Sequence, residues 1–576
     1  MPKSENHQHA FAISLCWLVF LLVGFSACKK TPSTPTPPPP QPPSSTTFQI
    51  QRQTINSKIF NSSKTVFGIN ANPVIQISFS DKVDKNSLAS AISYTNKSNS
   101  NSNVPFSISY QNNDSTVIIV PSKAITFLNQ YSFSISTLAK SASGNSLSNR
   151  SDLVFVTQID STDKFPQLSD SALLDLVEKQ TFKYFWDFGH PVSGMARERS
   201  NGDNETVTTG GTGFGIMAMI AAVHRGFITR QDAVNRISTI TDFLLTKCER
   251  WHGAFAHWIN GSTGATIPFG KNTGADIVET SFLVQGLLTA RQYFDNNNAS
   301  EIALRDSINS IWKAVDWKWF TQNGNTQSLY WQYNPSYSNT SDIWSIPVTG
   351  WNEALITYIL GASSPDHAIS KSIYDNGWAR NGAIKNGNSY YNILLPLGPN
   401  LGGPLFFAHY SFLGLNPNQL SDQYANYWDQ NAAHSKINYQ YCVFNPNQFY
   451  GYSNLCWGLT ASDDNKGYDA HSPTNDDGVI SPTAAISSIP YAPTESMNAI
   501  RFFYYKLGDK LWGDYGFVDA FNLSQLWFAN SFLAIDQGPQ IVMIENYRSG
   551  LLWNLFMSCP EVKQGLKALG FSSPYL

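Results

Sequence analysis

The stretch Gly274–Phe294, GADIVETSFLVQGLLTARQYF, shows the pattern that governs most of this chain. Its apolar residues recur at helical spacing, so a helix is predicted over 277–294. The series Leu173, Leu174, Val177, Phe182 and Phe185 follows the same spacing, and strand signals are sparse after about residue 168. Further helices are predicted over 214–225, 232–247, 301–320, 353–361, 404–412, 420–434, 495–507, 520–533 and 539–557.

With one or two ambiguous segments, the predicted helices number about twelve. Long connections rich in Gly, Asn and Trp join them. A region of this kind, which we place at residues 161–576, predicts an all-α fold built as a double ring of helices, an (α/α)6 barrel. In that architecture the connections at one end of the barrel build the cleft.

Residues 48–160 follow a different pattern, that of an all-β domain. Phe106–Tyr110 and Tyr131–Ile135 alternate between apolar and polar residues, and Val117–Val120 is a short apolar run. Such segments, separated by Asn, Ser and Asp turns, predict a β-sandwich. The segment resembles the bacterial Ig-like domains found in front of surface enzymes. It holds no cluster of catalytic residue types, so we interpret it as a spacer.

The first residues predict export. Phe11–Phe25 is an apolar run, shorter than the roughly 20 residues that span a membrane and typical of a signal peptide over residues 1–27. It ends in FSAC, which resembles a bacterial lipobox and implies a lipidated Cys28; an ordinary secretory signal with an incidental Cys is the alternative. Residues 28–47 are rich in Pro and predict a semi-rigid stalk. We therefore expect a membrane-anchored lipoprotein, periplasmic or on the outer-membrane surface of a Gram-negative bacterium.

Composition restricts the partners. Charged residues make up 14% of the chain, against a usual value of roughly 25%, and the net charge is −3 with no Lys/Arg run, so no nucleic acid is expected. The cysteines after Cys28 are scattered, which disfavours zinc; a Cys442–Cys456 disulfide and buried free thiols both remain open. The acidic loop 463–477 fits no EF-hand and is interpreted as a solvated loop at the cleft rim. We expect no metal, no cofactor and a monomer.

Seven stretches, in this order along the chain, resemble the glycoamylase-like domain family, which includes the bacterial β-1,2-glucanases of glycoside hydrolase family 144. The resemblance runs from about Asp163 to Leu576 and implies an (α/α)6 fold and hydrolysis of β-1,2-glucan. The stretches are TGGTGFGIMAMIAAVHRGFI (209–228), HGAFAHWINGSTGATIPF (252–269), GADIVETSFLVQGLLTARQYF (274–294), GWNEALITYILGASSP (350–365), GGPLFFAHYSFLGL (402–415), ISPTAAISSIPYAPTESM (480–497) and AIDQGPQIVMIENYRSGLLWNLFM (534–557).

Cleavage of a glycosidic bond needs one carboxylic acid that protonates the leaving oxygen and one carboxylate that activates water or attacks. Glu353 lies at a predicted helix start, between Trp351 and Asn352 on one side and an apolar run on the other. Trp351 can stack on a sugar and Asn352 can bond a hydroxyl. Related helical-barrel glycosidases carry their acid on this connection, so Glu353 is the predicted general acid. A Glu that only complements the helix dipole is the alternative.

Asp276 and Glu279 form a D-x-x-E pattern that places both on one side of a helix. The same pattern is typical of a capping box. The family resemblance implies that the pair belongs to the active site, in chemistry or in binding sugar hydroxyls. Family members usually have an acid four residues before the Asp, where this chain has Asn272.

Asp536 lies between the last two predicted helices, on the connection that carries the base in related barrels. It is the candidate base, or an N-cap before a helix that begins with Pro. Glu545 and Arg548 form either a buried ion pair or a sugar clamp. The remaining predicted sugar-binding residues are His257, Trp258, His409, Tyr410 and Trp457, together with Asn272, Trp351 and Asn352.

These features predict a glycoside hydrolase that cleaves β-1,2-glucan oligosaccharides or polysaccharides, with endo action favoured, by an inverting mechanism with Glu353 as acid. An exo-acting enzyme that releases sophorose and a hydrolase of another glucan linkage are the alternatives within this class. A glycan-binding lipoprotein without catalysis is the alternative from another class, and Asn272 is the residue that favours it.

Overall fold

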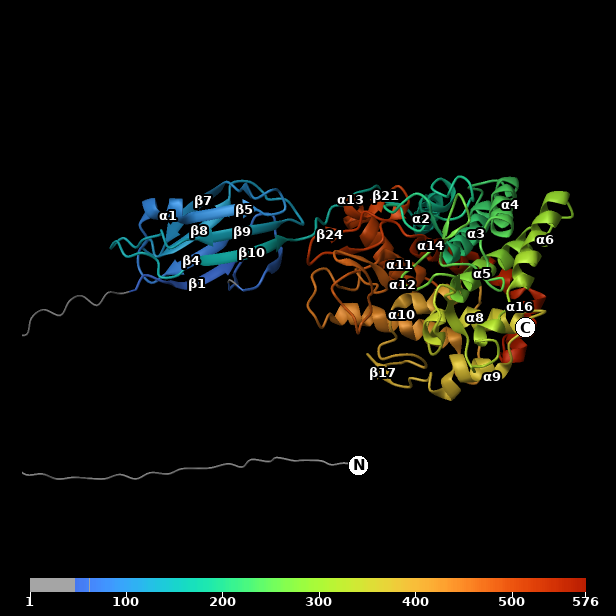
Figure 1. Cartoon of the computed structure of the whole chain (residues 1–576). Coiled ribbons are helices and arrows are strands. Elements are labelled where there is room, and N and C mark those ends of the chain that lie inside the picture. Colours follow the sequence, from blue (N-terminus) through green and yellow to red (C-terminus); the bar gives the residue numbers. More distant parts are fainter. Residues whose placement is uncertain (1–46, 62) are drawn as a thin grey trace, which may run out of the picture.

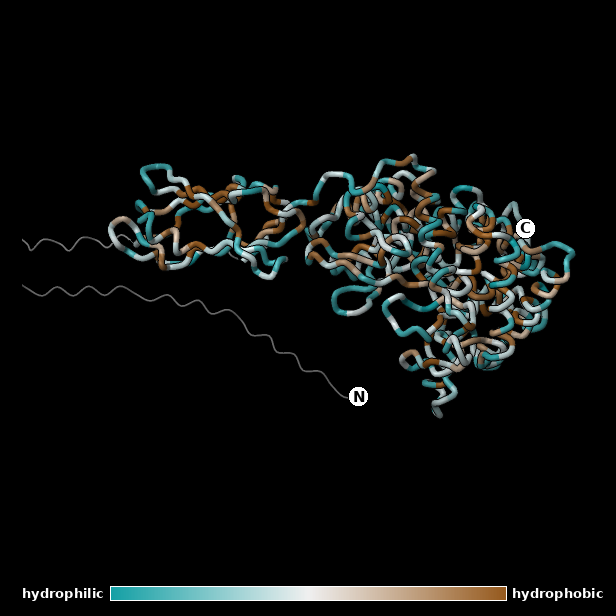
Figure 2. Tube along the Cα trace, turned by 90° about the horizontal axis from the view of Figure 1, so that it is seen from above, coloured by the Kyte–Doolittle hydropathy of each residue, from teal (hydrophilic) through white to brown (hydrophobic). Residues whose placement is uncertain are grey.

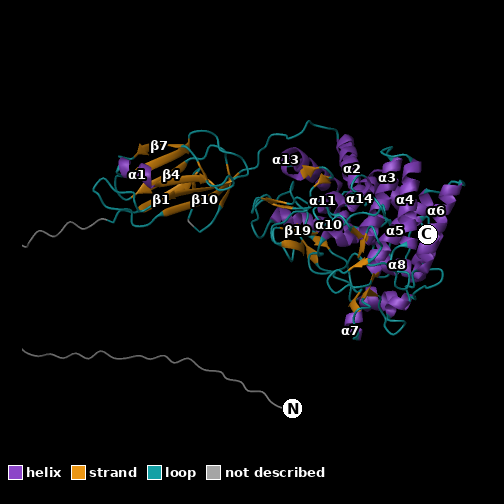
Figure 3. Ribbon diagram, turned by 45° about the horizontal axis from the view of Figure 1, so that its top comes forward, coloured by secondary structure: helices purple, strands orange, loops and turns teal. Residues whose placement is uncertain are grey.

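The computed structural model describes residues 47–61 and 63–576, which form a β domain and a helical domain that follow one another along the chain (Figure 1). Strands dominate the first domain and helices the second (Figure 3). Each domain has its own hydrophobic core, and apolar residues gather inside both (Figure 2). The predicted signal peptide, Cys28 and all but the last residue of the Pro-rich segment lie outside the described residues. No helix in the described part of the chain is long and apolar enough to cross a membrane.

The β domain is a sandwich of two five-stranded sheets. Alternate residues of the strands point into a shared core, as Ile75, Ile77 and Phe79 do on β4. All strand pairs are antiparallel except β3 with β10. In spatial order the first sheet holds β2 (Lys58–Ile59), β1 (Ile50–Ile55), β4 (Ile75–Phe79), β8 (Thr116–Pro121) and β7 (Phe106–Gln111), and the second holds β3 (Val66–Ile69), β10 (Ser151–Thr157), β9 (Gln130–Ile135), β5 (Ile92–Asn96) and β6 (Ser102–Asn103).

The helical domain packs buried helices against outer ones. Helix α3 buries nearly all of its residues and contacts α5, α14 and α2, whereas α4 and α6 pack on the outside of this group. A helix that is apolar on every side must be surrounded by others. The main helices are α2 (Asp170–Trp186), α3 (Thr209–His224), α4 (Arg230–Thr246), α5 (Ile277–Tyr293), α6 (Ala299–Ala314), α8 (Leu355–Ser363), α10 (Tyr427–Phe444), α11 (Pro482–Ser487), α12 (Pro493–Arg501), α14 (Ala534–Ser549), α15 (Leu551–Met557) and α16 (Pro560–Leu569).

Glycines let α3 and α5 touch through their backbones. A Cβ atom on Gly213 would lie 2.2 Å from the carbonyl oxygen of Phe282, and one on Gly286 would lie 2.2 Å from the carbonyl oxygen of Gly213. One turn earlier, a Cβ on Gly210 would lie 2.5 Å from a side-chain oxygen of Glu279. The close approach of the two helices therefore continues up to their N-terminal ends, where Glu279 lies.

Two predicted helices are not α-helical. Residues 404–412 form two short 3-10 helices, η4 (Leu405–Ala408) and η5 (Tyr410–Leu413), that meet at His409. Gly402 and Gly403, which have positive φ values, end the preceding loop, and Pro404 is the N-cap residue of η4. Residues 520–533 form a hairpin of β23 (Phe521–Asn522) and β24 (Trp527–Phe528) instead. Its backbone pairs with Ile480, a residue distant in sequence, so a tertiary contact overrides the apolar spacing.

Gly213→Ala is expected to destabilise the helical domain, because its methyl group would meet backbone atoms of α5 that cannot move aside. Overpacking of this kind costs roughly 1–3 kcal/mol or more, which chemical denaturation would measure as a lower midpoint. Gly361→Ala on α8 is the matched control, since its methyl group would meet the flexible end of the Ile369 side chain at 3.0 Å. A Gly213→Ala protein as stable as wild type would show that the helices tolerate separation.

Candidate active site

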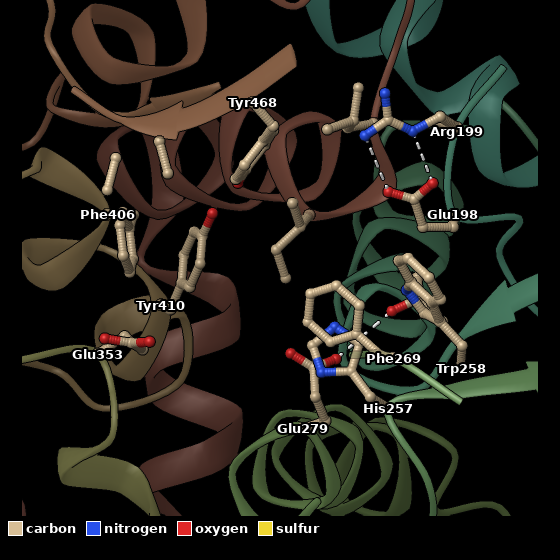
Figure 4. Close-up of a pocket in the computed structure, with 15 residues that line it drawn as sticks. Glu198, Arg199, His257, Trp258, Phe269, Glu279, Glu353, Phe406, Tyr410 and Tyr468 are labelled. Carbon is tan, nitrogen blue, oxygen red and sulfur yellow. Dashed lines mark hydrogen bonds and ion pairs between the residues drawn. The ribbon is translucent and has the colours of Figure 1, made fainter. Parts of the chain in front are cut away.

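A cavity of about 480 Å³ opens where the N-terminal ends of several buried helices meet. Thr208 is the N-cap residue of α3, Asp276 of α5 and Leu533 of α14, and Glu353 lies just before α8. Helix N-termini carry partial positive charge, so this end of the domain favours acidic groups. The lining residues are Glu198, Arg199, Thr208, His257, Trp258, Phe269, Glu279, Glu353, Phe406, Tyr410, Ala461, Tyr468, Ala470, Leu533 and Ile535 (Figure 4).

Glu353 lines this cavity, on a different wall from Glu279 (Figure 4). Ser411 donates a hydrogen bond to its backbone carbonyl and so holds the segment before α8 in place. Burial raises the pKa of Glu353 to about 8, its own backbone N–H opposes this shift, and the carboxylates of Glu279 and Asp276 add to it. Glu353 is therefore a carboxylic acid that keeps its proton at neutral pH, as a general acid must.

Glu279 lies in the first turn of α5 and crosses to α3. One of its carboxylate oxygens accepts a hydrogen bond from the backbone N–H of Gly210 at 2.7 Å and another from the hydroxyl of Thr208 at 3.4 Å. Burial raises its pKa, while His257 and these hydrogen bonds lower it and Asp276 raises it. The side chain is thus fixed in direction, with its remaining oxygen available to the cavity.

Asp276 is completely buried and does not line the cavity. One oxygen accepts hydrogen bonds from the N–H groups of Val278 and Glu279, at 3.1 and 3.0 Å, and caps α5. The other is 3.0 Å from Nδ1 of His257. Its hydrogen bonds occupy both oxygens, so the capping interpretation describes Asp276, whereas Glu279 bonds α3 instead of completing a capping box.

His257 connects this acidic pair to the cavity. Burial lowers its pKa, but the nearby carboxylate of Glu279 and the hydrogen bond to Asp276 outweigh that effect and raise it to about 9. Because Nδ1 faces Asp276, the other ring nitrogen is free for a ligand. The imidazole is therefore a cation at neutral pH, and its charge favours the ionised form of Glu279.

Asp536 lies in the first turn of α14 without capping it, since the N-cap residue is Leu533. Its carboxylate oxygens are inaccessible to solvent and bond no N–H or hydroxyl group in the described chain. They meet the carboxyl group of Asp519 instead, and burial together with this neighbour raises the pKa of Asp536 well above its usual value. Burial also raises the pKa of Asp519, to about 7. Two carboxyl groups this close retain a proton between them.

The pair Glu198 and Arg199 was not predicted from the sequence. Nε of Arg199 lies 2.8 Å from Glu198 and Nη1 lies 3.0 Å from Asp463. The N–H of Asp463 in turn donates to Asp519 at 2.7 Å, so the network ends at the Asp519–Asp536 pair. The only sequence signal for this pair was two adjacent charged residues shortly before the TVTTGG segment. That signal did not show that Asp463, 264 positions after Arg199, would complete the network.

Aromatic rings form two walls of the cavity. Trp258 and Phe269 lie 4.5 Å apart between ring centroids, and Phe406 and Tyr410 lie 5.1 Å apart. Tyr468 comes from the acidic loop, which forms the hairpin of β19 (Ala461–Asp464) and β20 (Gly467–Ala470) at the cavity. Among the described residues no cluster of His, Cys, Asp and Glu could hold a metal ion.

Several predicted sugar-binding residues do not line the cavity. Trp351 is 5% exposed and packs against Trp378 and Tyr427. The side chain of Asn352 accepts a hydrogen bond from the N–H of Ala354, just before α8. Trp351 and Asn352 are next to Glu353 in the sequence, but the backbone before α8 points their side chains away from the cavity.

His409, Trp457 and Asn272 are also buried away from the cavity. Nε2 of His409 is 3.0 Å from the hydroxyl of Ser488, and Nε1 of Trp457 donates to the carbonyl of Glu495 at 3.3 Å. The amide oxygen of Asn272 accepts from the N–H of Gly274, two residues later. In each case a protein group occupies a polar atom that was expected to bind sugar.

Glu545 and Arg548 lie towards the C-terminal end of α14, whereas the cavity lies at its N-terminal end. Glu545 is fully buried and pairs with Arg225 at 2.6 Å, and Arg548 pairs with Glu178 at 2.6 Å. Both residues therefore form ion pairs, but with other partners and not with each other, and neither lines the cavity as a sugar clamp would. All four cysteines in the described chain, Cys248, Cys442, Cys456 and Cys559, are free thiols, so Cys442 and Cys456 form no disulfide.

One cavity combines paired aromatic rings, a carboxylic acid that keeps its proton (Glu353) and a second carboxyl group (Glu279). Cleavage of a glycosidic bond uses an acid and a second carboxyl group in this way, so fold and site define a glycoside hydrolase. The family model described as "Putative glucoamylase" matches residues 345–560, and the model of the bacterial Ig-like domain matches residues 52–157. The chain belongs to the glycoamylase-like family and carries an Ig-like domain before the helical one.

Relatives with known names support this assignment. A solved structure from Bacteroides uniformis, with the same glucoamylase description, is 55% identical (TM-score 0.70; 72% of this chain and 100% of that one). The endo-β-1,2-glucanase from Chitinophaga pinensis is 50% identical (TM-score 0.69; 71% and 100%). The exo β-1,2-glucooligosaccharide sophorohydrolase (non-reducing end) from Parabacteroides distasonis is 45% identical over 425 residues, which cover 70% of this chain. The match spans 58% of that relative's length.

The role of Asp276 predicts the behaviour of His257. Asp276→Asn removes the charge that the imidazole faces, so the pKa of His257 should fall from about 9 towards its ordinary value of 6.5. An NMR titration of labelled histidine measures this shift, with Asp477→Asn on the exposed acidic loop as the control. If the pKa of His257 is unchanged in Asp276→Asn, the carboxylate of Glu279 alone is responsible for raising it.

Proposed function

We propose that the protein hydrolyses β-1,2-glucan with Glu353 as general acid. The observation that carries the proposal is a glutamic acid with a pKa of about 8 in the wall of a cavity lined by aromatic rings. The linkage comes from the relatives, since the enzymes from Chitinophaga pinensis and Parabacteroides distasonis are both named for β-1,2-linked glucans.

In this mechanism the proton of Glu353 moves to the glycosidic oxygen as its bond to the anomeric carbon breaks. A water molecule attacks that carbon from the opposite side and gives up a proton, so the configuration inverts. Asp536 is the proposed acceptor of this proton, as a member of the pair with Asp519 that shares a single proton and so keeps one negative charge. Because its oxygens are closed off from the cavity, the proton reaches it through an intervening hydroxyl or water.

We further propose that the helical domain is an (α/α)6 barrel. The buried helices α3, α5, α8, α11 and α14, with η5 in the remaining position, would form the inner ring. Contacts between α3 and α5, α5 and α8, α11 and α14, and α14 and α3 support this arrangement. The helices α2, α4, α6, α10, α12 and α16 would form the outer ring.

Endo action remains our first proposal, and exo action is the second candidate. The relative from Parabacteroides distasonis, an exo-acting sophorohydrolase, favours the second, and the endo-glucanase from Chitinophaga pinensis favours the first. The signal-like segment, FSAC and the Pro-rich stretch support the further proposal that the enzyme is anchored through Cys28 outside the cytoplasm.

The purified enzyme should release sugar from linear β-1,2-glucan and little or none from β-1,3-, β-1,4- and α-1,4-glucans. Products separated by size distinguish the two modes of attack: a broad range of oligosaccharides indicates endo action, and sophorose from the first minutes indicates exo action. Binding of the glucan without any release of sugar would support the non-catalytic alternative instead.

Glu353→Gln should reduce kcat by about 10²–10⁴-fold, because glutamine keeps the size of the side chain but cannot donate the proton. In wild type, kcat should fall as pH rises through about 8, where Glu353 loses its proton. Glucan binding and melting temperature should change little. The matched control is Glu249→Gln, an exposed glutamate outside the cavity. Near-normal turnover in a folded Glu353→Gln enzyme would remove Glu353 from the mechanism.

A further inference from the structure

A second cavity, of about 410 Å³, lies beside the catalytic one. Arg199 lines both, and so does the β19–β20 hairpin, which presents Tyr468 to the first and Asp464 to the second. The catalytic roles above use none of the other groups in this second cavity. It is lined by Arg199, Asn201, Asp463, Asp464, Gly467, Trp527, Phe528, Ala529, Asn530 and Ser531.

Trp527 is the distinctive group of the second cavity. It lies on β24 and is partly exposed, and within the described chain its ring stacks on no other aromatic ring and its indole N–H has no hydrogen-bond partner. The adjacent Phe528, by contrast, stacks on the buried Phe521 with centroids 6.3 Å apart and anchors the hairpin. The fold therefore holds the hairpin through Phe528 and leaves the indole of Trp527 free for a ligand.

The charges around the second cavity disfavour an anionic ligand, and the third carboxylate there, Asp464, accepts hydrogen bonds from the N–H groups of Lys466 and Gly467. Glu198 and Asp463 both pair with Arg199, so its positive charge is balanced by carboxylates. At the rim, Asn201 and Asn530 are exposed and their side chains meet at 3.1 Å, which leaves further amide donors and acceptors open. A neutral ligand with many hydroxyl groups and an apolar face matches an indole surrounded by amides.

We propose that the second cavity is a distal subsite for the glucan chain whose cleaved bond lies in the catalytic cavity. This inference rests on the proposed function. Trp527 stacks on the C–H face of one glucosyl residue, and Asn201 and Asn530 bond its hydroxyls. The subsite is occupied only when the substrate is long enough to pass the β19–β20 hairpin, so it gives the enzyme a preference for longer chains.

The test compares long linear β-1,2-glucan with the shortest oligosaccharide that the enzyme cleaves. Trp527→Ala should raise KM for the long glucan by about fivefold or more, the effect of losing roughly 1 kcal/mol of contact. Its kcat on the long glucan, and both constants on the short substrate, should remain as in wild type. Trp527→Phe keeps an aromatic ring and should restore most of the affinity. Phe444→Ala, which removes a ring that is 69% exposed elsewhere on the surface, is the control.

Two outcomes would overturn the distal subsite while the proposed function stands: an unchanged KM for the long glucan, or an equal rise for both substrates. If wild type cleaves no glucan, the proposed function fails, and calorimetry with the long glucan still tests the subsite. Weaker binding by Trp527→Ala than by Phe444→Ala would then support a glycan site at Trp527. Equal binding by the two variants would refute it.

Discussion

The backbone contact between α3 and α5 is the constraint on which the site depends. Gly213 and Gly286 allow the two helices to approach until an added methyl group would lie 2.2 Å from backbone oxygen. Since the helices run together up to their N-terminal ends, the N–H of Gly210 reaches the carboxylate of Glu279. A wider separation would lose this hydrogen bond and release the acidic side chain. The close packing of α3 against α5 in the core therefore also fixes the position of the Glu279 carboxylate at the cavity.

Two physical effects oppose each other at the cavity. The N-termini of the buried helices favour ionised carboxylates, whereas burial favours the protonated acids. At Glu353 burial outweighs the side chain's own backbone N–H and raises its pKa. Asp276 instead accepts two backbone hydrogen bonds and faces the imidazole of His257, which fixes it as the cap of α5. The surroundings of each acidic side chain, and not the residue type, therefore decide what it can do.

The network from Arg199 to Asp536 shows why part of the site could not be predicted. Asp463 and Asp519 are ordinary acidic residues in the sequence, and Asp463 lies in a loop that we interpreted as solvated. The structure connects Asp463 to Arg199 on one side and to Asp519 on the other. The isolation of the Asp536 carboxyl group from solvent follows from this packing. Hydrogen bonds between distant segments leave no local pattern in the chain.

Local patterns were sufficient for the helix α5, the alternating strands of the β domain and the position of Glu353 before α8, because spacing and capping act within a few residues. The seven stretches that resemble the family, taken in their order along the chain, were also sufficient to recognise it. The tertiary structure alone decided which neighbours of Glu353 face the cavity, and it directed Trp351 into the core. It also turned residues 520–533 into a hairpin by pairing them with Ile480. Side-chain direction and long-range pairing depend on what packs against a segment, and that information is spread over the whole chain.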